Sequence, residues 1–169
     1  MLKIINDLKP FFEDCYQRIN VREYAKLMRI SPPTASKLLS YYNSEGLLKR
    51  ESYRNYLFFF ANKESPNFID LSRMYWRHRL SSLTAFLEKE LLEPTIVLFG
   101  SLAKAEAKRD SDVDLAIFSQ RKRIDVSVFE KKLKRKIQIF WFRLFSDIRN
   151  RELANNIFNG YVLKGRLNI

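Results

Sequence analysis

Residues 98–118 read LFGSLAKAEAKRDSDVDLAIF, and this stretch decides how the second half of the chain folds. An apolar run stops at Gly100 and Ser101, and a strand-like run resumes with Asp112 and Asp114, one residue apart. Because side chains alternate along a strand, both carboxylates leave the same face and can share one divalent cation. A glycine at the end of the first strand, with a helix predicted to follow, lets a phosphate approach the backbone and free N–H groups.

The flanking pattern alternates between strand and helix. A long helix, FIDLSRMYWRHRLSSLTAFLEKELLEP, ends at Pro94 and precedes the strand TIVLF, and a short helix is predicted from about Leu102. Strand DVDLAIF, helix VSVFEKKLKR, strand KIQIFWF and helix SDIRNRELANNIFN follow, ending at Gly160. We therefore predict a two-domain α+β or α/β protein, in which residues 65–169 form a small mixed β-sheet with flanking helices.

Residues 1–64 show a different pattern, and the polar segment NKESPN at 62–67 marks the junction. A helical stretch interrupted by Pro10 comes first. Asn20 then precedes VREYAKLMR with Glu23 at the capping-box spacing, which predicts a second helix. ISPPTASKLLSYYNSEGLL has a capping serine, an early proline and a closing glycine, and two strand-like runs surround the turn Ser-Tyr-Arg-Asn. Helix, turn, helix and hairpin is the order of a winged helix-turn-helix.

Residues 18–62 resemble, in this architecture, the small winged-helix domains of prokaryotic regulators. In such a domain the second helix can lie in a DNA major groove, and the hairpin can reach the phosphate backbone. Winged helices also serve as dimerisation or protein-docking modules, so this alternative stays open. The candidate DNA-binding residues are Thr34, Ser36, Lys37, Ser40 and Tyr41 on the second helix and Arg50 and Arg54 on the hairpin.

Charge and composition narrow the classes of partner. The 169 residues carry 31 Lys and Arg against 19 Asp and Glu, a net charge of +12 that favours polyanions such as nucleic acid or nucleotide phosphates. Part of this charge lies in RKRIDVSVFEKKLKRK at 121–136, which could line the approach of a polyanion or form only a solvated face. The lone histidine, His78, has no ligand cluster around it and is interpreted as a surface or packing residue.

Cysteine count and hydropathy suggest a location. A single cysteine, Cys15, excludes an internal disulfide framework and a cysteine-based zinc site, which fits a reducing compartment. No apolar run approaches the roughly 20 residues of a membrane span, and the N-terminus lacks the pattern of a signal peptide. We expect a cytoplasmic protein without a membrane partner.

The combined stretch GSLAKAEAKRDSDVDL resembles the signature of the DNA polymerase beta-like nucleotidyltransferase superfamily, in particular its minimal nucleotidyltransferases. Members often read Gly-Ser-x-Ala-Arg-Gly followed by Ser-Asp-x-Asp-Leu, and the likeness covers roughly residues 67–165, including NNIFNGYVLKG. The resemblance implies a nucleoside triphosphate substrate and Mg²⁺ or Mn²⁺. By position, it makes Gly100, Ser101 and Lys104 the nucleotide-binding residues, and Asp112 and Asp114 the catalytic, metal-binding residues.

Two positions depart from that signature. Ala105 replaces the usual glycine, and Gln138 stands where the family's third carboxylate is expected. A glutamine can coordinate a cation weakly through its amide oxygen, but it cannot act as a base or add negative charge. Chemistry at this site could therefore be slow, could recruit a carboxylate from elsewhere, or could be absent.

These observations leave two hypotheses of different class. The first is a Mg²⁺-dependent nucleotidyltransferase with a DNA-binding winged helix and an unknown acceptor. The second is a DNA-binding regulator, or an antitoxin-like protein with a protein acceptor, whose transferase domain is weakened or inactive. A winged helix often reads paired half-sites, so both hypotheses also allow a homodimer.

Overall fold

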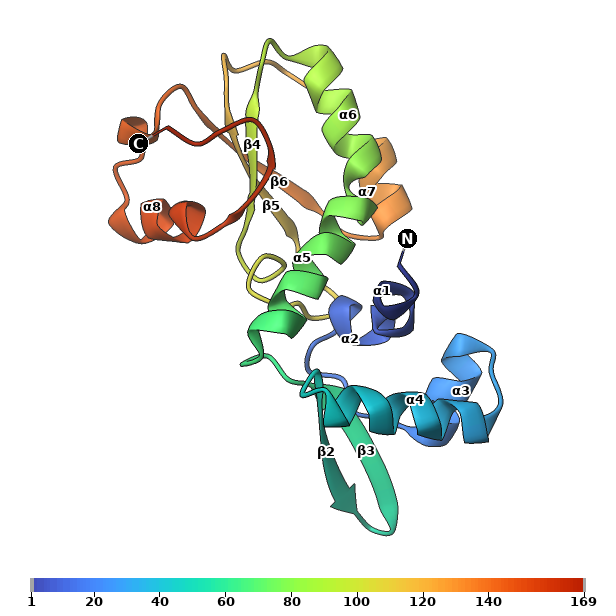
Figure 1. Cartoon of the computed structure of the whole chain (residues 1–169). Helices are drawn as coiled ribbons and strands as arrows, with labels where there is room; N and C mark the ends of the chain where they lie inside the picture. The colour runs from blue at the N-terminus through green and yellow to red at the C-terminus, as the bar shows by residue number, and fades with distance from the viewer. Residues whose placement is uncertain (1, 169) are drawn as a thin grey trace. The chain divides into compact units, whose positions relative to one another are not determined.

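The structure is a computed structural model that describes residues 2–168 (Figure 1). The chain divides into two compact units. Unit 1 comprises Met1–Ser72 and Ala105–Arg109, and unit 2 comprises Arg73–Lys104 and Asp110–Ile169. The division between Ser72 and Arg73 falls within one helix, α5 (Pro66–Arg79), and not at the polar segment 62–67. No helix of the described residues is both long and apolar enough to cross a membrane.

Unit 1 combines short helices with a three-stranded antiparallel sheet of order β1-β3-β2. Apolar residues of its helices and of all three strands supply most of the buried side chains of this unit. Its elements before α5 are α1 (Lys3–Asp7), α2 (Lys9–Glu13), β1 (Ile19–Asn20), α3 (Val21–Met28), α4 (Pro32–Ser44), β2 (Leu48–Tyr53) and β3 (Tyr56–Ala61).

The local signals read from the sequence of unit 1 act as expected at both helix starts. The Asn20 side chain accepts from the Glu23 backbone N–H at 3.0 Å, and Glu23 Oε2 accepts from the Asn20 N–H at 2.9 Å, so the capping box forms. Ser31 caps α4 by accepting from the Thr34 N–H. These caps fix where α3 and α4 begin, and therefore the turn between them.

The hairpin turns on two residues. Arg54 and Asn55 have positive φ values of 44° and 64°, and Tyr53 pairs with Tyr56 across them. Positive φ at both central residues is the pattern of a type I′ turn, whose twist matches that of the flanking strands. The hairpin is thus a regular β-ribbon with Arg54 at its tip.

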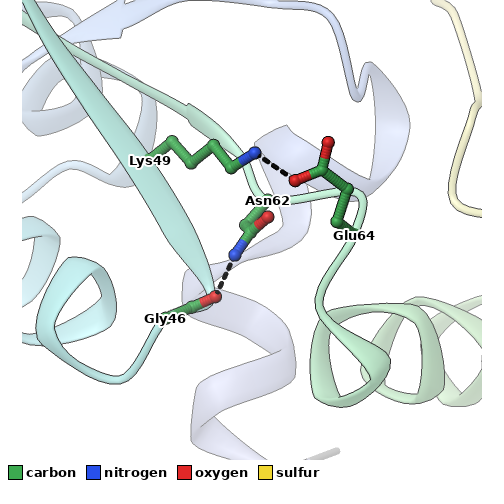
Figure 2. A network of polar contacts seen from close by, with 4 residues as sticks. All are labelled: Gly46, Lys49, Asn62 and Glu64. Carbon is green, nitrogen blue, oxygen red and sulfur yellow. Dashed lines mark hydrogen bonds and ion pairs between the residues drawn. The ribbon is translucent and has the colours of Figure 1, made fainter.

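Polar contacts hold the helices and the hairpin of unit 1 together. Tyr42 donates to the buried Asp7 carboxylate at 2.7 Å, and Tyr24 donates to the Asp7 carbonyl at 2.8 Å, which ties α1 to α3 and α4. Figure 2 shows that Asn62 donates to the Gly46 carbonyl and that Lys49 pairs with Glu64. The polar segment 62–67 is therefore fastened to the hairpin.

Unit 2 is built on a mixed four-stranded sheet of order β6-β5-β4-β7. Strand β4 is antiparallel to β5 and to β7, and β5 is parallel to β6. Figure 1 shows α6 and α7 on one side of this sheet and α8 on the other. The elements after α5 are α6 (Ser81–Glu90), β4 (Thr95–Phe99), β5 (Val113–Phe118), α7 (Ser127–Leu133), β6 (Ile137–Phe142), a 3-10 turn (Phe145–Asp147), α8 (Arg151–Phe158) and β7 (Tyr161–Lys164).

The core between the sheet and α8 follows from strand alternation. Val97 and Phe99 on β4 and Ala116 on β5 are buried on one face, where they cluster with Ile148 and with Ile157 of α8. The small mixed sheet with flanking helices predicted for this part of the chain is confirmed.

Three local expectations were wrong or incomplete. The helix predicted from Leu102 is a turn, because Gly100 and Ala105 both adopt positive φ (72° and 56°) and leave only four residues between them. The single long helix is broken at the buried Leu80, whose ψ of 0° redirects the chain between α5 and α6. Strands β1 and β7 were not predicted, because two and four residues carry too little alternation to be recognised.

Candidate functional site

The strand directions of unit 2 bring one terminus of each strand to the same edge of the sheet. This edge is formed by the strand termini, and it is not the side of an outer strand. Strand β4 ends there, and its antiparallel neighbour β5 begins there, so that Phe99 pairs with Asp114. Strand β6 runs parallel to β5 and begins at the same edge, where Gln138 is the register partner of Asp114. Residues 38 positions apart in the sequence, Gly100 and Gln138, thus lie at one edge of the sheet.

Gly100 is required by the closeness of Asp114. Its φ of 72° lies in the left-handed region, and a Cβ built on Gly100 would overlap the Asp114 Oδ2 atom. Both observations favour glycine, because only glycine adopts this φ without strain and leaves room for the carboxylate. The backbone at the end of β4 therefore lies directly against the side chain of Asp114.

A pair of glycine substitutions separates the strain of positive φ from the overlap of a Cβ with Asp114. Gly100→Ala is expected to lower the free energy of unfolding by about 3 kcal/mol, because the cost of positive φ is joined by displacement of Asp114. Gly46→Ala is the control, since Gly46 has a φ of 70° and, apart from its chain neighbours, no atom of residues 2–168 lies within 4 Å of an added Cβ. Its loss should be about 1 kcal/mol. Equal losses in urea unfolding would contradict the close packing of Gly100 against Asp114.

Asp114 is a half-buried carboxylate whose charge is poorly compensated. Burial, and secondarily the nearby Asp112, raise the pKa of Asp114 above its ordinary value. Within residues 2–168, no hydrogen bond or ion pair reaches the Asp114 carboxylate from another side chain or backbone group. A buried charge without a partner is costly, so this site favours a ligand that supplies positive charge.

Gln138 completes the polar cluster with a neutral group. Its Nε2 donates to Asp112 Oδ2 at 2.6 Å, which joins β6 to the residue that precedes β5. No group of three or more His, Cys, Asp or Glu side chains placed to hold a metal ion occurs among the described residues. The cluster therefore offers two carboxylates and one amide, a donor set that suits one hard cation with water or phosphate oxygens as further ligands.

The turn after β4 is held from two sides. Arg73 Nε of α5 donates to the Ala103 carbonyl at 3.0 Å, and Lys104 Nζ donates to Asn156 Oδ1 of α8 at 2.6 Å. Lys104 is exposed and Ser101 half-exposed, so both can meet a ligand at this edge. Arg73 and Asn156 were missed from the sequence, because nothing in their local pattern links them to residues 101–105.

A buried arginine positions the start of β5. Arg135 is only 7% exposed, donates to the Ser111 carbonyl at 2.6 Å and stacks on the Trp76 ring at 5.0 Å. It thereby fixes the backbone one residue before Asp112. The basic segment 121–136 is therefore not only a solvated face, since Lys122 also pairs with Glu90.

Ala105 occupies a backbone position that suits glycine. It is buried and has a φ of 56°. Ala105→Gly is expected to raise the free energy of unfolding by about 0.5–1 kcal/mol, because relief of left-handed strain exceeds the entropy that glycine adds to the unfolded chain. Ala103→Gly, at a buried position without positive φ, should destabilise instead. Chemical denaturation of both variants gives the sign, and a destabilised Ala105→Gly protein would contradict the strain.

The predicted DNA-binding residues all lie in unit 1 and are all exposed. Five project from α4, one from β2 and one from the hairpin tip: Thr34, Ser36, Lys37, Ser40, Tyr41, Arg50 and Arg54. The apolar positions of α4 between them, Ala35, Leu39 and Tyr42, are buried. The other predicted site residues belong to unit 2, and His78 is an exposed residue of α5.

Comparison with known proteins assigns the family. The family described as Polymerase beta, Nucleotidyltransferase matches residues 82–166, which is half of the chain. The chain belongs to this nucleotidyltransferase family. The match includes β4, the turn after it, β5 and β6, and it confirms the superfamily predicted from GSLAKAEAKRDSDVDL. Neither a curated protein nor a solved structure matches the chain.

Proposed function

We propose that unit 2 binds a nucleoside triphosphate together with Mg²⁺ or Mn²⁺ and transfers its nucleotidyl group to an acceptor. The supporting observation is the half-buried, uncompensated Asp114 carboxylate lying against the glycine turn that ends β4. Family membership supports nucleotidyl transfer as the class of reaction and a nucleotide as the substrate.

Each residue of the cluster has a distinct role in this proposal. Gly100 and Ser101 offer backbone N–H groups and a hydroxyl to the triphosphate, and the Lys104 ammonium neutralises part of its charge. Asp112 and Asp114 hold the cation. When bound, the cation neutralises charge on the phosphate oxygens and orients the triphosphate. In most analyses of such transfers the protein contributes mainly positioning and charge neutralisation.

The reaction forms one bond and breaks one. The acceptor nucleophile bonds to the α-phosphorus. The bond between the α-phosphorus and the oxygen that bridges to the β-phosphate breaks, and pyrophosphate leaves with that oxygen. The acceptor also loses a proton, which the amide of Gln138 cannot take up. The proton therefore passes to water or to a group on the acceptor, and we expect transfer to be slow.

The test is incubation of the whole chain with α-labelled triphosphates, Mn²⁺ or Mg²⁺, and candidate DNA, RNA and protein acceptors. Transfer of label to one acceptor, lost in Asp112→Ala/Asp114→Ala, supports the proposal. Label transfer that persists in this double variant would contradict the roles given to both carboxylates.

We propose that unit 1 is a winged helix-turn-helix that binds DNA. Two capped helices, α3 and α4, are followed by the β2–β3 hairpin, and β1 joins β3 to complete a small sheet. The outward face of α4 carries small polar side chains with Lys37 and Tyr41, which suits contact with base edges and phosphates. Arg50 and Arg54 place positive charge on the hairpin.

A salt series tests this second proposal. Lys37→Ala and Arg54→Ala should each weaken DNA binding and lower the slope of log affinity against log salt by about 1, because each removes one phosphate contact. Lys9→Ala, an exposed lysine of α2, is the control and should leave the slope unchanged. Absence of any shift of DNA at low salt would leave unit 1 as a docking or dimerisation module.

A regulator with a weakened transferase domain is the second candidate function, and Gln138 and Ala105 favour it. In that case the nucleotide acts as a ligand that unit 2 senses, or a partner protein is the acceptor, as in an antitoxin-like protein. Nucleotide binding without label transfer to any acceptor supports the regulator. Labelling of a co-purified protein supports the antitoxin-like role.

A further inference from the structure

Strand β6 is an open edge of the sheet in unit 2. Among the strands of the described residues, it is the terminal strand in the order β6-β5-β4-β7 and pairs with β5 alone. Its sequence is IQIFWF, and its apolar side chains from Ile139 to Phe142 are all partly exposed. Edge strands are commonly protected by charges, proline or a bulge, because their free peptide groups pair readily with another chain. None of these devices lies within β6.

The hydrogen-bond pattern shows which peptide groups are free. The Lys136 carbonyl accepts from the Val113 N–H, and the Phe142 carbonyl accepts from the Ser119 N–H. The backbone N–H and C=O groups of the even-numbered residues of β6 therefore point toward β5. The backbone N–H and C=O groups of the odd-numbered residues point toward the open edge. The first, Ile137, donates its N–H to Glu130 Oε1 at 2.9 Å. For Ile139 and Trp141, no hydrogen bond on the outer side joins them to another described residue.

Charge around β6 favours one kind of occupant. Residues 131–146 contain six Lys or Arg, of which Arg135 is buried. The two acidic residues that flank this segment accept backbone N–H groups, Glu130 from Ile137 and Asp147 from Arg143 and Leu144. Lys134 and Lys136 are exposed before the strand, and Arg143 is exposed after it. Antiparallel pairing of two copies of β6 would bring Lys136 close to Arg143 of the second copy, and like charges facing each other are destabilising. The edge therefore suits a foreign strand with acidic ends better than it suits itself.

We propose that β6 docks an extended apolar segment of a partner protein that is flanked by acidic residues. The segment adds a fifth strand to the sheet through the peptide groups of Ile139 and Trp141, as in known strand-addition complexes. Its acidic ends lie beside Lys136 and Arg143. Because Gln138 belongs to the same strand, a segment docked here lies next to the candidate nucleotide site.

The test uses the whole chain and fluorescent peptides. The probe DEVTVTVDE should bind with a Kd in the micromolar range, and KKVTVTVKK, with the same apolar core, should bind at least about 10-fold more weakly because of charge alone. DEVTVTVDE with alternate backbone nitrogens methylated on the pairing side should not bind. The Lys136→Glu/Arg143→Glu variant should reverse the preference between the acidic and basic peptides.

Each other result overturns the proposal. Equal binding of the methylated peptide would exclude strand addition. Equal binding of both charged peptides would exclude the acidic flanks. Self-association in sedimentation, without peptide binding, would make a second copy the occupant. Amide exchange gives a separate readout, since bound DEVTVTVDE should slow exchange at Ile139 and Trp141 whether or not unit 2 binds a nucleotide.

Discussion

Asp114→Asn is expected to lower nucleotidyl transfer by at least about 1000-fold, the equivalent of about 4 kcal/mol of transition-state stabilisation. The Asp114 carboxylate is half-buried and lies against the glycine turn, so under the proposed function it would hold the cation where the phosphates enter. Asparagine keeps the shape of the side chain but removes its charge. Affinity for Mn²⁺ and the triphosphate should fall with the rate.

The stability of the same variant distinguishes a lost ligand from a lost fold. Removal of a half-buried charge that lies close to Asp112 should leave the Tm of the nucleotide-free protein unchanged or raise it. Asp110→Asn is the matched control, because Asp110 is exposed in the loop that precedes β5 and its loss changes the net charge equally. It should retain transfer. A large fall in Tm for Asp114→Asn, or equal loss of transfer in both variants, would contradict the role of Asp114.

Gln138→Glu is expected to raise the transfer rate by about 100-fold, the lower range for a positioned general base. Gln138 pairs with Asp114 in register and bonds to Asp112, so a carboxylate here would add a proton acceptor and negative charge for a second cation. Titration with Mn²⁺ in the presence of a non-hydrolysable triphosphate should show one more bound ion than in the unmodified protein.

The Tm of Gln138→Glu and a second variant provide controls for the expected rise in transfer rate. Without cations, a third negative charge beside Asp112 should lower the Tm, and Mg²⁺ should restore it. Gln120→Glu makes the same change of charge on an exposed residue beyond the other end of β5 and should alter neither the rate nor the ion count. A Gln138→Glu protein with unchanged rate and unchanged ion count would show that the missing carboxylate does not limit this site.

Much of the fold of unit 2 could be predicted from the sequence, because its signals are local. TIVLF is a continuous apolar run and KIQIFWF is a mostly apolar run interrupted by Gln138, and they form β4 and β6 as expected. In unit 1, the capping box of Asn20 and the pair formed by the N-cap Ser31 and the first α4 residue Pro32 likewise act within a few residues. The turn at 101–105 was mistaken for a helix, since the positive φ of Ala105 is imposed by tertiary structure and alanine does not signal it.

The composition of the candidate site was predictable, but its supports were not. Gly100, Asp112 and Asp114 fall within one motif, whereas Arg73, Arg135 and Asn156 reach it through side chains from distant elements. Such contacts depend on packing and leave no periodic signal. The hydrogen bond between Gln138 and Asp112 also depends on strand order, which places β6 beside β5.

The most direct measurement is a crystal structure of the protein with Mn²⁺ and a non-hydrolysable nucleoside triphosphate. We expect an anomalous peak between the carboxylates of Asp112 and Asp114, with the triphosphate against the backbone of Gly100 and Ser101. A triphosphate bound elsewhere on the protein, or manganese absent from this carboxylate pair under saturating conditions, would contradict the nucleotide site.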